Sequence, residues 1–155
     1  GSVLDTLQQA NARLDGELGR QREHETRERQ DAERDLLLEL LELRDRLQAG
    51  QDQLRGYRPG WLARRGGAGE YVSGIAAGQA MLLRRLDEIL ARRGVRPLPA
   101  LGQRFDPRSM HAAETANHPE RDDGQVVGEI RTGFFFHGRL LRPAEVIVNK
   151  RDSNS

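Results

Sequence analysis

The first third of the chain contains no proline. From Val3 to Leu54, glycine occurs only at positions 16, 19 and 50, so little in this stretch interrupts a helix. A helix of roughly fifty residues would be about 75 Å long, because each residue adds about 1.5 Å. A single small domain cannot bury that length. We therefore expect residues 1–54 to form one long helix that needs a partner.

Leucines mark one face of this predicted helix. They recur at alternating steps of three and four, the a and d spacing of a two-stranded coiled coil, and the polar Asn11 falls in the same seam. This spacing predicts a homodimer that is paired along the helix. The seam consists of Leu4, Leu7, Leu14 and Leu18.

The middle of the helix has a different character. Residues 20–31 contain no apolar side chain, and opposite charges such as Glu23 and Arg27 stand four apart. We interpret this segment as solvated helix, with a binding surface as the alternative. Leucines then resume, and Leu37 and Leu41 widen the stripe, which indicates more than two packed helices. The resumed stripe places Leu36, Leu40, Leu43 and Leu47 at the predicted dimer interface.

A glycine-rich stretch separates this helix from a second one. Residues 55–70 hold five glycines and one proline, which is typical of a loop, and we expect Trp61 to pack this loop against nearby helices. Residues 71–94 have one apolar stripe, and Gly94 followed by Pro97 predicts a sharp helix end. Two chains that each contribute both helices would build a four-helix bundle. The second helix adds Leu82, Leu86 and Ile89 to the predicted dimerisation residues.

The helical period stops after Pro97. Asp106 as N-cap and Pro107 at the first helical position predict a short helical turn through about Ala113. Short strand patterns follow, and tight turns are expected at Thr132-Gly133 and His137-Gly138. The predicted strands are residues 125–131, 133–137, 139–142 and 144–149.

These segments predict an α+β fold. A long N-terminal helix forms a coiled-coil-like dimer, the shorter helical segments form a dimeric four-helix bundle, and residues 95–150 form a small β lobe, or wing. Residues 151–155 are expected to be a disordered tail. Three adjacent phenylalanines lie in the lobe, and strand alternation would put Phe134 and Phe136 on one face and Phe135 on the other. At least one of them is therefore a candidate for a partner surface.

Composition argues against several classes of function. With 25 basic and 24 acidic residues the net charge is +1, so we expect neither nucleic acid nor a membrane as a partner. No apolar run approaches the ~20 residues of a membrane span. The chain has no cysteine, which fits a reducing, cytoplasmic location. No nucleophile stands beside a base in local context, so we expect no enzyme activity and no cofactor.

One cluster of side chains in the lobe has the chemistry of metal ligands. His111, Glu114 and His118 would share one face if they lay on a helix. Pro119 should break such a helix before the last ligand arrives, and no fourth ligand is fixed. We therefore expect no metal site, with His111 capping or packing in the lobe and His118 exposed.

Two segments of the lobe resemble the signature of one family. FDPRSMHAA begins at Phe105, and VVGEIRTGFFFHGRLLRPAEVIVNK runs from Val126 to Lys150. In this order they resemble the C-terminal region of GrpE, the nucleotide exchange factor of the DnaK heat-shock chaperone, and Gly78–Val95 resembles the second helix of that family. The resemblance implies a homodimer whose wing binds the ATPase domain of a DnaK-type chaperone and opens the cleft that holds ADP.

The resemblance also implies which residues touch the chaperone. Ile130 lies beside the turn at Gly133, and Arg139 belongs to the HGR motif. Alternatives exist for three of them: Arg139 could form a salt bridge within the lobe, and Ile130 and Val148 could belong to its core. Gly133 is expected to act as a turn former whose effect on binding is indirect, and Phe135 is added as the phenylalanine on the other strand face. The predicted contact residues are Ile130, Gly133, Phe135, Arg139 and Val148.

The helices depart from the family pattern. Leu38 and Leu41 stand where the family usually has Pro and Asp, and Arg27 and Ala32 occupy positions expected to be aromatic. These departures motivate an alternative function, a dimeric adaptor or scaffold that keeps the GrpE-like fold without exchange activity.

Overall fold

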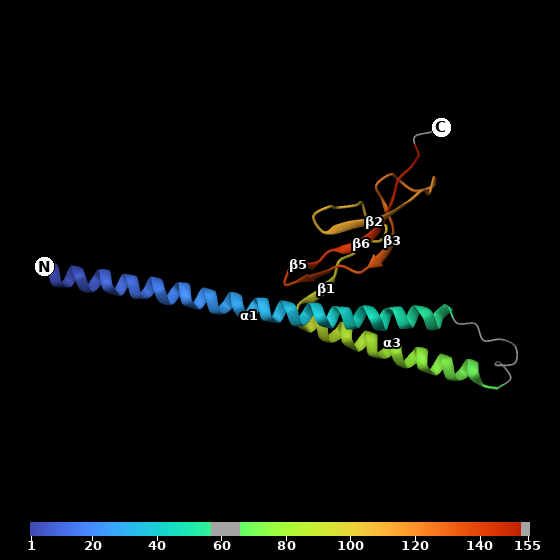
Figure 1. The fold of residues 1–155 in the computed structure, drawn as a ribbon, viewed down its shortest axis with the longest axis horizontal. Coiled ribbons are helices and arrows are strands. Elements are labelled where there is room, and N and C mark those ends of the chain that lie inside the picture. The colour runs from blue at the N-terminus through green and yellow to red at the C-terminus, as the bar shows by residue number, and fades with distance from the viewer. Residues whose placement is uncertain (57–65, 153–155) are drawn as a thin grey trace. The chain divides into compact units, whose positions relative to one another are not determined.

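The computed structural model describes residues 1–56 and 66–152. The predicted packing of Trp61 therefore lies outside the described residues. Within them two helices precede six strands, which confirms the α+β class (Figure 1). The chain divides into two units, Gly1–Leu40 and Leu41–Ser155. The elements are α1 (Ser2–Gly56), α3 (Ala68–Arg92), β1 (Val95–Pro97), β2 (Met110–Ala116), β3 (Val126–Arg131), β4 (Phe134–Phe136), β5 (Arg139–Arg142) and β6 (Ala144–Asn149).

The first unit consists of helix. α1 begins at Ser2 and continues through the whole unit, as the lack of proline predicts. The four leucines of the predicted seam are between 49% and 59% exposed in the single chain. In the polar segment, Arg27 lies 3.7 Å from Glu23, and His24 lies 3.0 Å from Glu28, so polar side chains four apart do contact each other. A helix with an uncovered apolar seam is stabilised mainly by packing against a partner.

The helices of the second unit end close to the predicted positions. α1 ends at Gly56, two residues beyond the predicted end, and α3 begins at Ala68, three residues before the predicted start. At the end of α3, Gly94 has a φ of +85° and its N–H donates to the carbonyl of Ala91 at 3.0 Å. This confirms the predicted stop, because glycine adopts that φ at little cost. Neither described helix is apolar enough over a sufficient length to cross a membrane.

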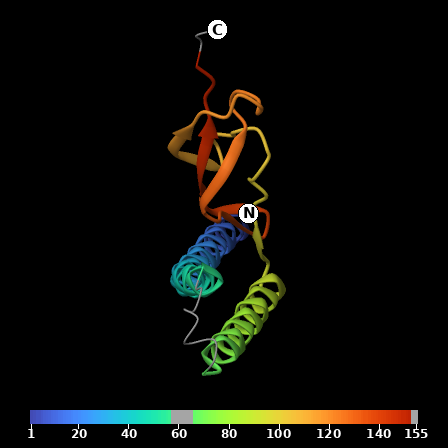
Figure 2. The same ribbon diagram turned by 90° about the vertical axis from the view of Figure 1, so that its right-hand side faces the viewer.

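The β lobe consists of two three-stranded sheets (Figure 1 and Figure 2). One has the order β1-β4-β5 with antiparallel neighbours. In the other, β6 lies in the centre, parallel to β2 and antiparallel to β3. β4 and β5 are joined at His137 and Gly138, whose φ angles of 48° and 78° confirm the predicted tight turn.

The lobe closes a small apolar core of its own. Both sheets contribute to its surroundings, since Phe135 and Leu140 come from one sheet and Val148 from the other, and all three are partly buried against the core. The buried core residues are Leu98, Ala100, Met110, Val126, Ala144 and Val146.

The predicted helical turn through Ala113 is wrong beyond its first turn. The Asp106 carbonyl accepts from the N–H groups of Ser109 and Met110, and the Asp106 carboxylate accepts from the N–H of Arg108, so the turn does begin as expected. Residues from Met110 onward instead form β2, which pairs with β6 in register from Met110 opposite Ala144. The chain thus gains a sheet partner and buries Met110, and this tertiary gain outweighs the local helix signal.

The predicted tight turn at Thr132-Gly133 is also wrong. β3 and β4 on either side of it belong to different sheets, so this segment is a crossover. Gly133 is buried, and its carbonyl accepts from the N–H of Leu98 at 2.8 Å. A Cβ at position 133 would lie 2.5 Å from the backbone N of Ala144, which leaves room only for glycine.

Candidate functional site

A buried ion pair joins the lobe to the last part of α1. Arg142 at the end of β5 donates from both terminal nitrogens to the two carboxylate oxygens of Asp45, each at 2.6 Å. Its Nε donates to the carbonyl of Thr132 at 2.9 Å. Arg131 of β3 donates to the same carboxylate at 3.3 Å. Strands of both sheets are therefore tied to one aspartate, and the Arg142 side chain is only 6% exposed.

The neighbouring residue of α1 makes the corresponding link to α3. Arg44 donates from Nε and Nη2 to the carboxylate of Asp87, at 2.6 and 3.2 Å. Its guanidinium lies 5.1 Å from the centre of the Phe134 ring, and that of Arg142 lies 5.3 Å from the same ring. Such distances are typical of cation–π contacts. Phe134 is buried between these groups, so it is part of this joint and not of a partner surface.

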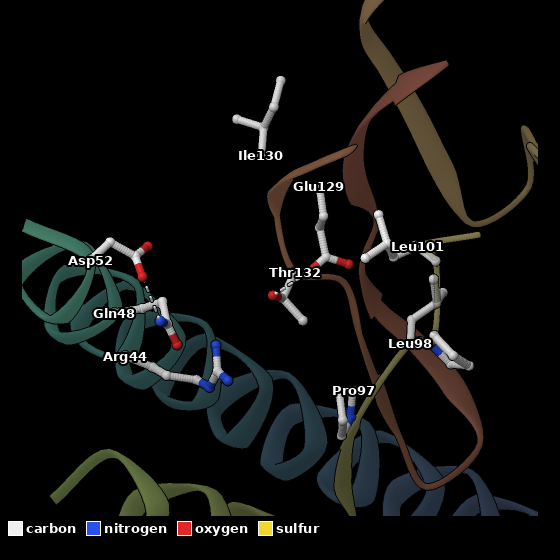
Figure 3. Close-up of a pocket in the computed structure, with 11 residues that line it drawn as sticks. Arg44, Gln48, Asp52, Pro97, Leu98, Leu101, Glu129, Ile130 and Thr132 are labelled. Atoms are coloured by element: carbon white, nitrogen blue, oxygen red, sulfur yellow. Dashed lines mark hydrogen bonds between the residues drawn. The ribbon is translucent and has the colours of Figure 1, made fainter. Parts of the chain in front are cut away.

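A groove of about 620 Å³ runs beside this joint, between α1 and the lobe (Figure 3). Its helix wall is polar and carries Arg44, Gln48 and Asp52, with Gln48 donating to Asp52 at 3.2 Å. Its lobe wall includes Leu101 and Ile130, which are 64% and 49% exposed. These are the exposed large apolar side chains of the described lobe, residues 95–152, and both line the same groove.

The structure separates the five predicted contact residues into two groups. Ile130 and Arg139 are exposed, and no ion pair to Arg139 occurs among residues 1–56 and 66–152. Phe135 and Val148 are partly buried against the lobe core, and Gly133 is buried at the crossover. Exposure favours a contact role for the first pair. The burial of the other three gives them a packing role in the lobe.

The predicted dimerisation residues are exposed or only half-buried in the single chain. In the first unit Leu36 is exposed and Leu40 is half-buried. The four seam leucines that precede them in α1 are exposed as well. In the second unit Leu41 is fully buried beside this stripe. On that part of the stripe and on α3, Leu43, Leu82 and Ile89 are exposed, and Leu47 and Leu86 are half-buried.

His111, Glu114 and His118 do not lie on a helix, so the helical arrangement considered for a metal site is wrong. His111 and Glu114 lie on β2, which alternates its side chains between two faces, and His118 lies beyond the end of that strand. In the described part of the chain, no three His, Asp or Glu side chains are placed to hold a metal ion. His118 is exposed, with its Nδ1 3.5 Å from Glu120.

One surface pair in the lobe has perturbed titration. Arg108 lowers the pKa of Asp106 below its ordinary value, chiefly through the side-chain hydrogen bond and then through the bond from its backbone N–H. The same hydrogen bond raises the pKa of Arg108. Because Arg108 is 88% exposed, solvent screens the pair, and its role is to fix the turn before β2.

Sequence reasoning missed the joint and Leu101. Asp45 and Arg142 are 97 positions apart, and nothing near either one in the sequence marks it as a partner of the other. Asp45 lies between Leu43 and Leu47 of the leucine stripe, as one of many charged helix residues. A signal was available for Arg142, since an arginine between the apolar Leu141 and Ala144 is expected to find a charged partner when it is buried.

Comparison with known proteins agrees with this architecture. The family model for GrpE matches residues 2–150. Protein GrpE of Rhodopirellula baltica is 33% identical over 120 residues, which cover 77% of this chain and 56% of the relative. Protein GrpE of Thioalkalivibrio sulfidiphilus is 32% identical over 112 residues, 72% of this chain and 54% of the relative.

The match to a third relative is shorter. Protein GrpE of Zymomonas mobilis is 37% identical over 84 residues, 54% of this chain and 44% of that protein. The chain thus spans about half the length of these curated relatives. Because the family model covers both helices and all six described strands, the chain belongs to the GrpE family.

Proposed function

We propose that this chain acts as a homodimeric nucleotide exchange factor, a co-chaperone that binds the ATPase domain of a DnaK-type chaperone and promotes ADP release. The observation that carries the proposal is the lobe surface. The lobe closes its own core, yet it leaves Ile130 and Leu101 exposed along one groove and Arg139 exposed on β5. Exposed apolar side chains gathered in one place are typical of a protein interface.

The proposed mechanism needs no catalytic group of its own. A factor that prefers the open form of the ATPase domain shifts the domain toward that form. The nucleotide then binds more weakly by the same factor as the preference, because the coupling between two binding sites is reciprocal. The lobe supplies contacts that are made better in the open form. The two chains are proposed to pair along the leucine seam and the exposed face of α3.

The direct test is ADP release from the cognate DnaK-type chaperone. The chaperone is loaded with a fluorescent ADP analogue and mixed with excess unlabelled nucleotide, with and without the chain. We expect the release rate to rise and to saturate with chain concentration, by at least about 10-fold. An unchanged rate at stoichiometric and higher dimer concentrations would remove the proposal.

Arg139→Ala tests the predicted contact. The truncated side chain can no longer pair with acidic groups of the ATPase domain, and we expect binding to weaken by about 10-fold with the dimer intact. Arg104→Ala is the matched control, because Arg104 is another exposed arginine of the lobe. Equal affinities for all three proteins would remove Arg139 from the interface. An equal loss in both variants would indicate a general charge effect.

The alternative is a dimeric adaptor without exchange activity. Leu41 departs from the family pattern, but it is fully buried, so packing explains the leucine at this position without a change of function. Recovery of an ATPase chaperone with the tagged chain from its own cells supports exchange. Recovery of other proteins alone, together with no effect on ADP release, supports the adaptor.

A further inference from the structure

Two adjacent residues of α1 hold two different parts of the second unit. Arg44 binds Asp87 on α3, and Asp45 binds Arg142 and Arg131 on the lobe. Two of these pairs, Asp45 with Arg142 and Asp87 with Arg44, have two hydrogen bonds each. Such a pair fixes an angle as well as a distance, because the planar guanidinium fits the planar carboxylate in one orientation. The direction of the lobe relative to this part of α1 is thereby defined.

The polar character of the joint calls for an explanation. Burying Arg142 costs desolvation, and apolar side chains of similar volume could pack the same space at no such cost. Apolar contacts, however, are non-directional and allow one surface to slide or turn on another. Arg142 instead uses its donors on Asp45 and on the Thr132 carbonyl, while its face lies over Phe134. This arrangement restricts rotation about the joint.

We propose that Asp45, Arg142 and Arg131 form a positioning device that fixes the orientation of the β lobe on α1, and that this fixed orientation lets the lobe distinguish open from closed ATPase domain. The second half of this inference rests on the proposed function. A lobe free to turn could follow the ATPase domain into its closed form and bind both forms. A ligand that binds two states equally shifts nothing, however tightly it binds.

Loss of the joint should affect the maximal rate of ADP release and the affinity for the chaperone differently. None of the three residues needs to touch the chaperone, so their loss should leave affinity largely in place and reduce the preference for one state. In Asp45→Asn we expect the maximal ADP-release rate at saturation to fall about 10-fold, while the half-saturating concentration changes less than about 3-fold. A lost contact residue would show the opposite pattern, a raised half-saturating concentration with the maximal rate retained.

One control variant and one substitute variant accompany this test. Glu42→Gln removes the same kind of charge one turn earlier on α1, where the side chain is exposed, and should leave both kinetic parameters unchanged. Should Asp45→Asn fail to fold, as judged by thermal melting, Arg142→Lys takes its place. Lysine keeps the charge and the apolar stem but cannot make the paired hydrogen bonds.

A second measurement is independent of any chaperone. The chain has no cysteine, so spin labels can be placed on cysteines introduced at exposed Gln53 of α1 and exposed Ala113 of β2. Mixing with excess unlabelled chain makes most dimers carry a single labelled copy. We expect one narrow distance distribution in the parent chain and a distribution at least about twice as wide in Asp45→Asn, because the bidentate restraint is lost.

The outcomes are distinguishable. A broadened distribution with a reduced maximal rate supports the inference. An unchanged distribution, or a broadened one with a normal maximal rate, overturns the positioning role in exchange. If the parent chain itself fails to accelerate ADP release, the proposed function is lost, and the distance measurement still decides whether Asp45 orients the lobe.

Discussion

Leu14 and Leu41 lie on the same helix in opposite environments. Leu14, in the first unit, is 56% exposed, whereas Leu41, at the start of the second unit, has no exposed surface. The difference lies in what the chain can fold back onto them. Residues 41–152 include a second helix and the two sheets of the lobe, whereas the first unit contains residues of α1 alone. Leu41 is thus covered within a single chain, whereas a second copy, as proposed above, would have to cover Leu14.

The two regions also obtain specificity differently. The first unit repeats one leucine spacing, so the proposed pairing would depend on many similar contacts. The second unit depends on single contacts between residues that are distant in the sequence, such as Asp45 with Arg142 and Asn149 with His118 in the loop after β2. A single substitution in the first unit should therefore weaken dimer association without abolishing it. A substitution at a unique contact of the second unit should unfold the lobe or change its orientation.

The largest effect is expected for Gly133→Val. The new side chain would begin 2.5 Å from the Ala144 backbone, so strands must move apart, and we expect the lobe to lose about 3 kcal/mol of stability. A urea titration followed by NMR signals of the lobe measures this loss. Gly74→Ala is the control, because open space surrounds that helical glycine and alanine should be neutral or stabilising there. A lobe of unchanged stability in Gly133→Val would contradict the described packing.

Asn149→Ala should have the next largest effect. The buried Asn149 side chain accepts from the N–H of His118 at 2.7 Å and donates to the carbonyls of His118 and Arg121 at 3.0 Å. Removing it takes a hydrogen-bond partner from the part-buried N–H of His118 and from the part-buried carbonyl of Arg121, at a cost of about 2 kcal/mol in the same titration. Asn117→Ala, an exposed residue with one bond to Asp152, should change stability by less than about 0.5 kcal/mol. Equal losses in both variants would mean that burial of Asn149 is irrelevant.

Leu14→Asp moves the comparison to the first unit. A charge in the seam should weaken the dimer by at least about 10-fold, about 1.4 kcal/mol, and leave the unfolding of the lobe unchanged. Sedimentation equilibrium measures the dissociation constant. Gln9→Asp, which adds the same charge off the a and d positions, is the control. A dimer as tight as that of the parent chain would exclude the seam, and a weakened lobe would show that the two regions are not independent.

The smallest effect concerns the surface pair before β2. The pKa of Asp106 is lowered in the folded chain, so its contribution to stability is present above the ordinary aspartate pKa and is lost as pH falls through the folded value. Arg108→Ala should move this pKa upward, toward the ordinary value, in an NMR titration, while the lobe stays folded. Arg104→Ala should not move it. A pKa that is the same in the parent chain and in Arg108→Ala would contradict the side-chain hydrogen bond as its main cause.

Features set by neighbouring residues were predictable from the sequence. The long helix follows from the lack of proline over 52 residues' worth of helix-forming sequence between Val3 and Leu54, and α1 differs from that range by two residues at most. The end of α3 follows from Gly94, which adopts its left-handed conformation. The turn between β4 and β5 follows from His137-Gly138. Each of these signals acts over a few residues, so no knowledge of the tertiary structure is needed.

Features set by distant residues were not predictable in this way. The local signal at Asp106 and Pro107 does start a turn, but the parallel partner that converts the next residues into β2 begins at Ala144. Likewise, the alternation of the three phenylalanines cannot reveal that Phe134 lies between Arg44 and Arg142. For the candidate site, the resemblance supplied Ile130 and Arg139, and only the fold brought Leu101 into the groove with Ile130 and Asp45 to Arg142.

The central claim is that the chain prefers an ATPase domain whose nucleotide cleft is open. Its most direct test is the affinity of the chain for the ATPase domain of its chaperone, measured by titration calorimetry without nucleotide and with saturating ADP. Reciprocal coupling predicts that ADP weakens binding by at least about 10-fold, matching the factor by which the chain weakens ADP binding. Equal affinity in the two titrations would contradict the account, since a partner without preference cannot release the nucleotide.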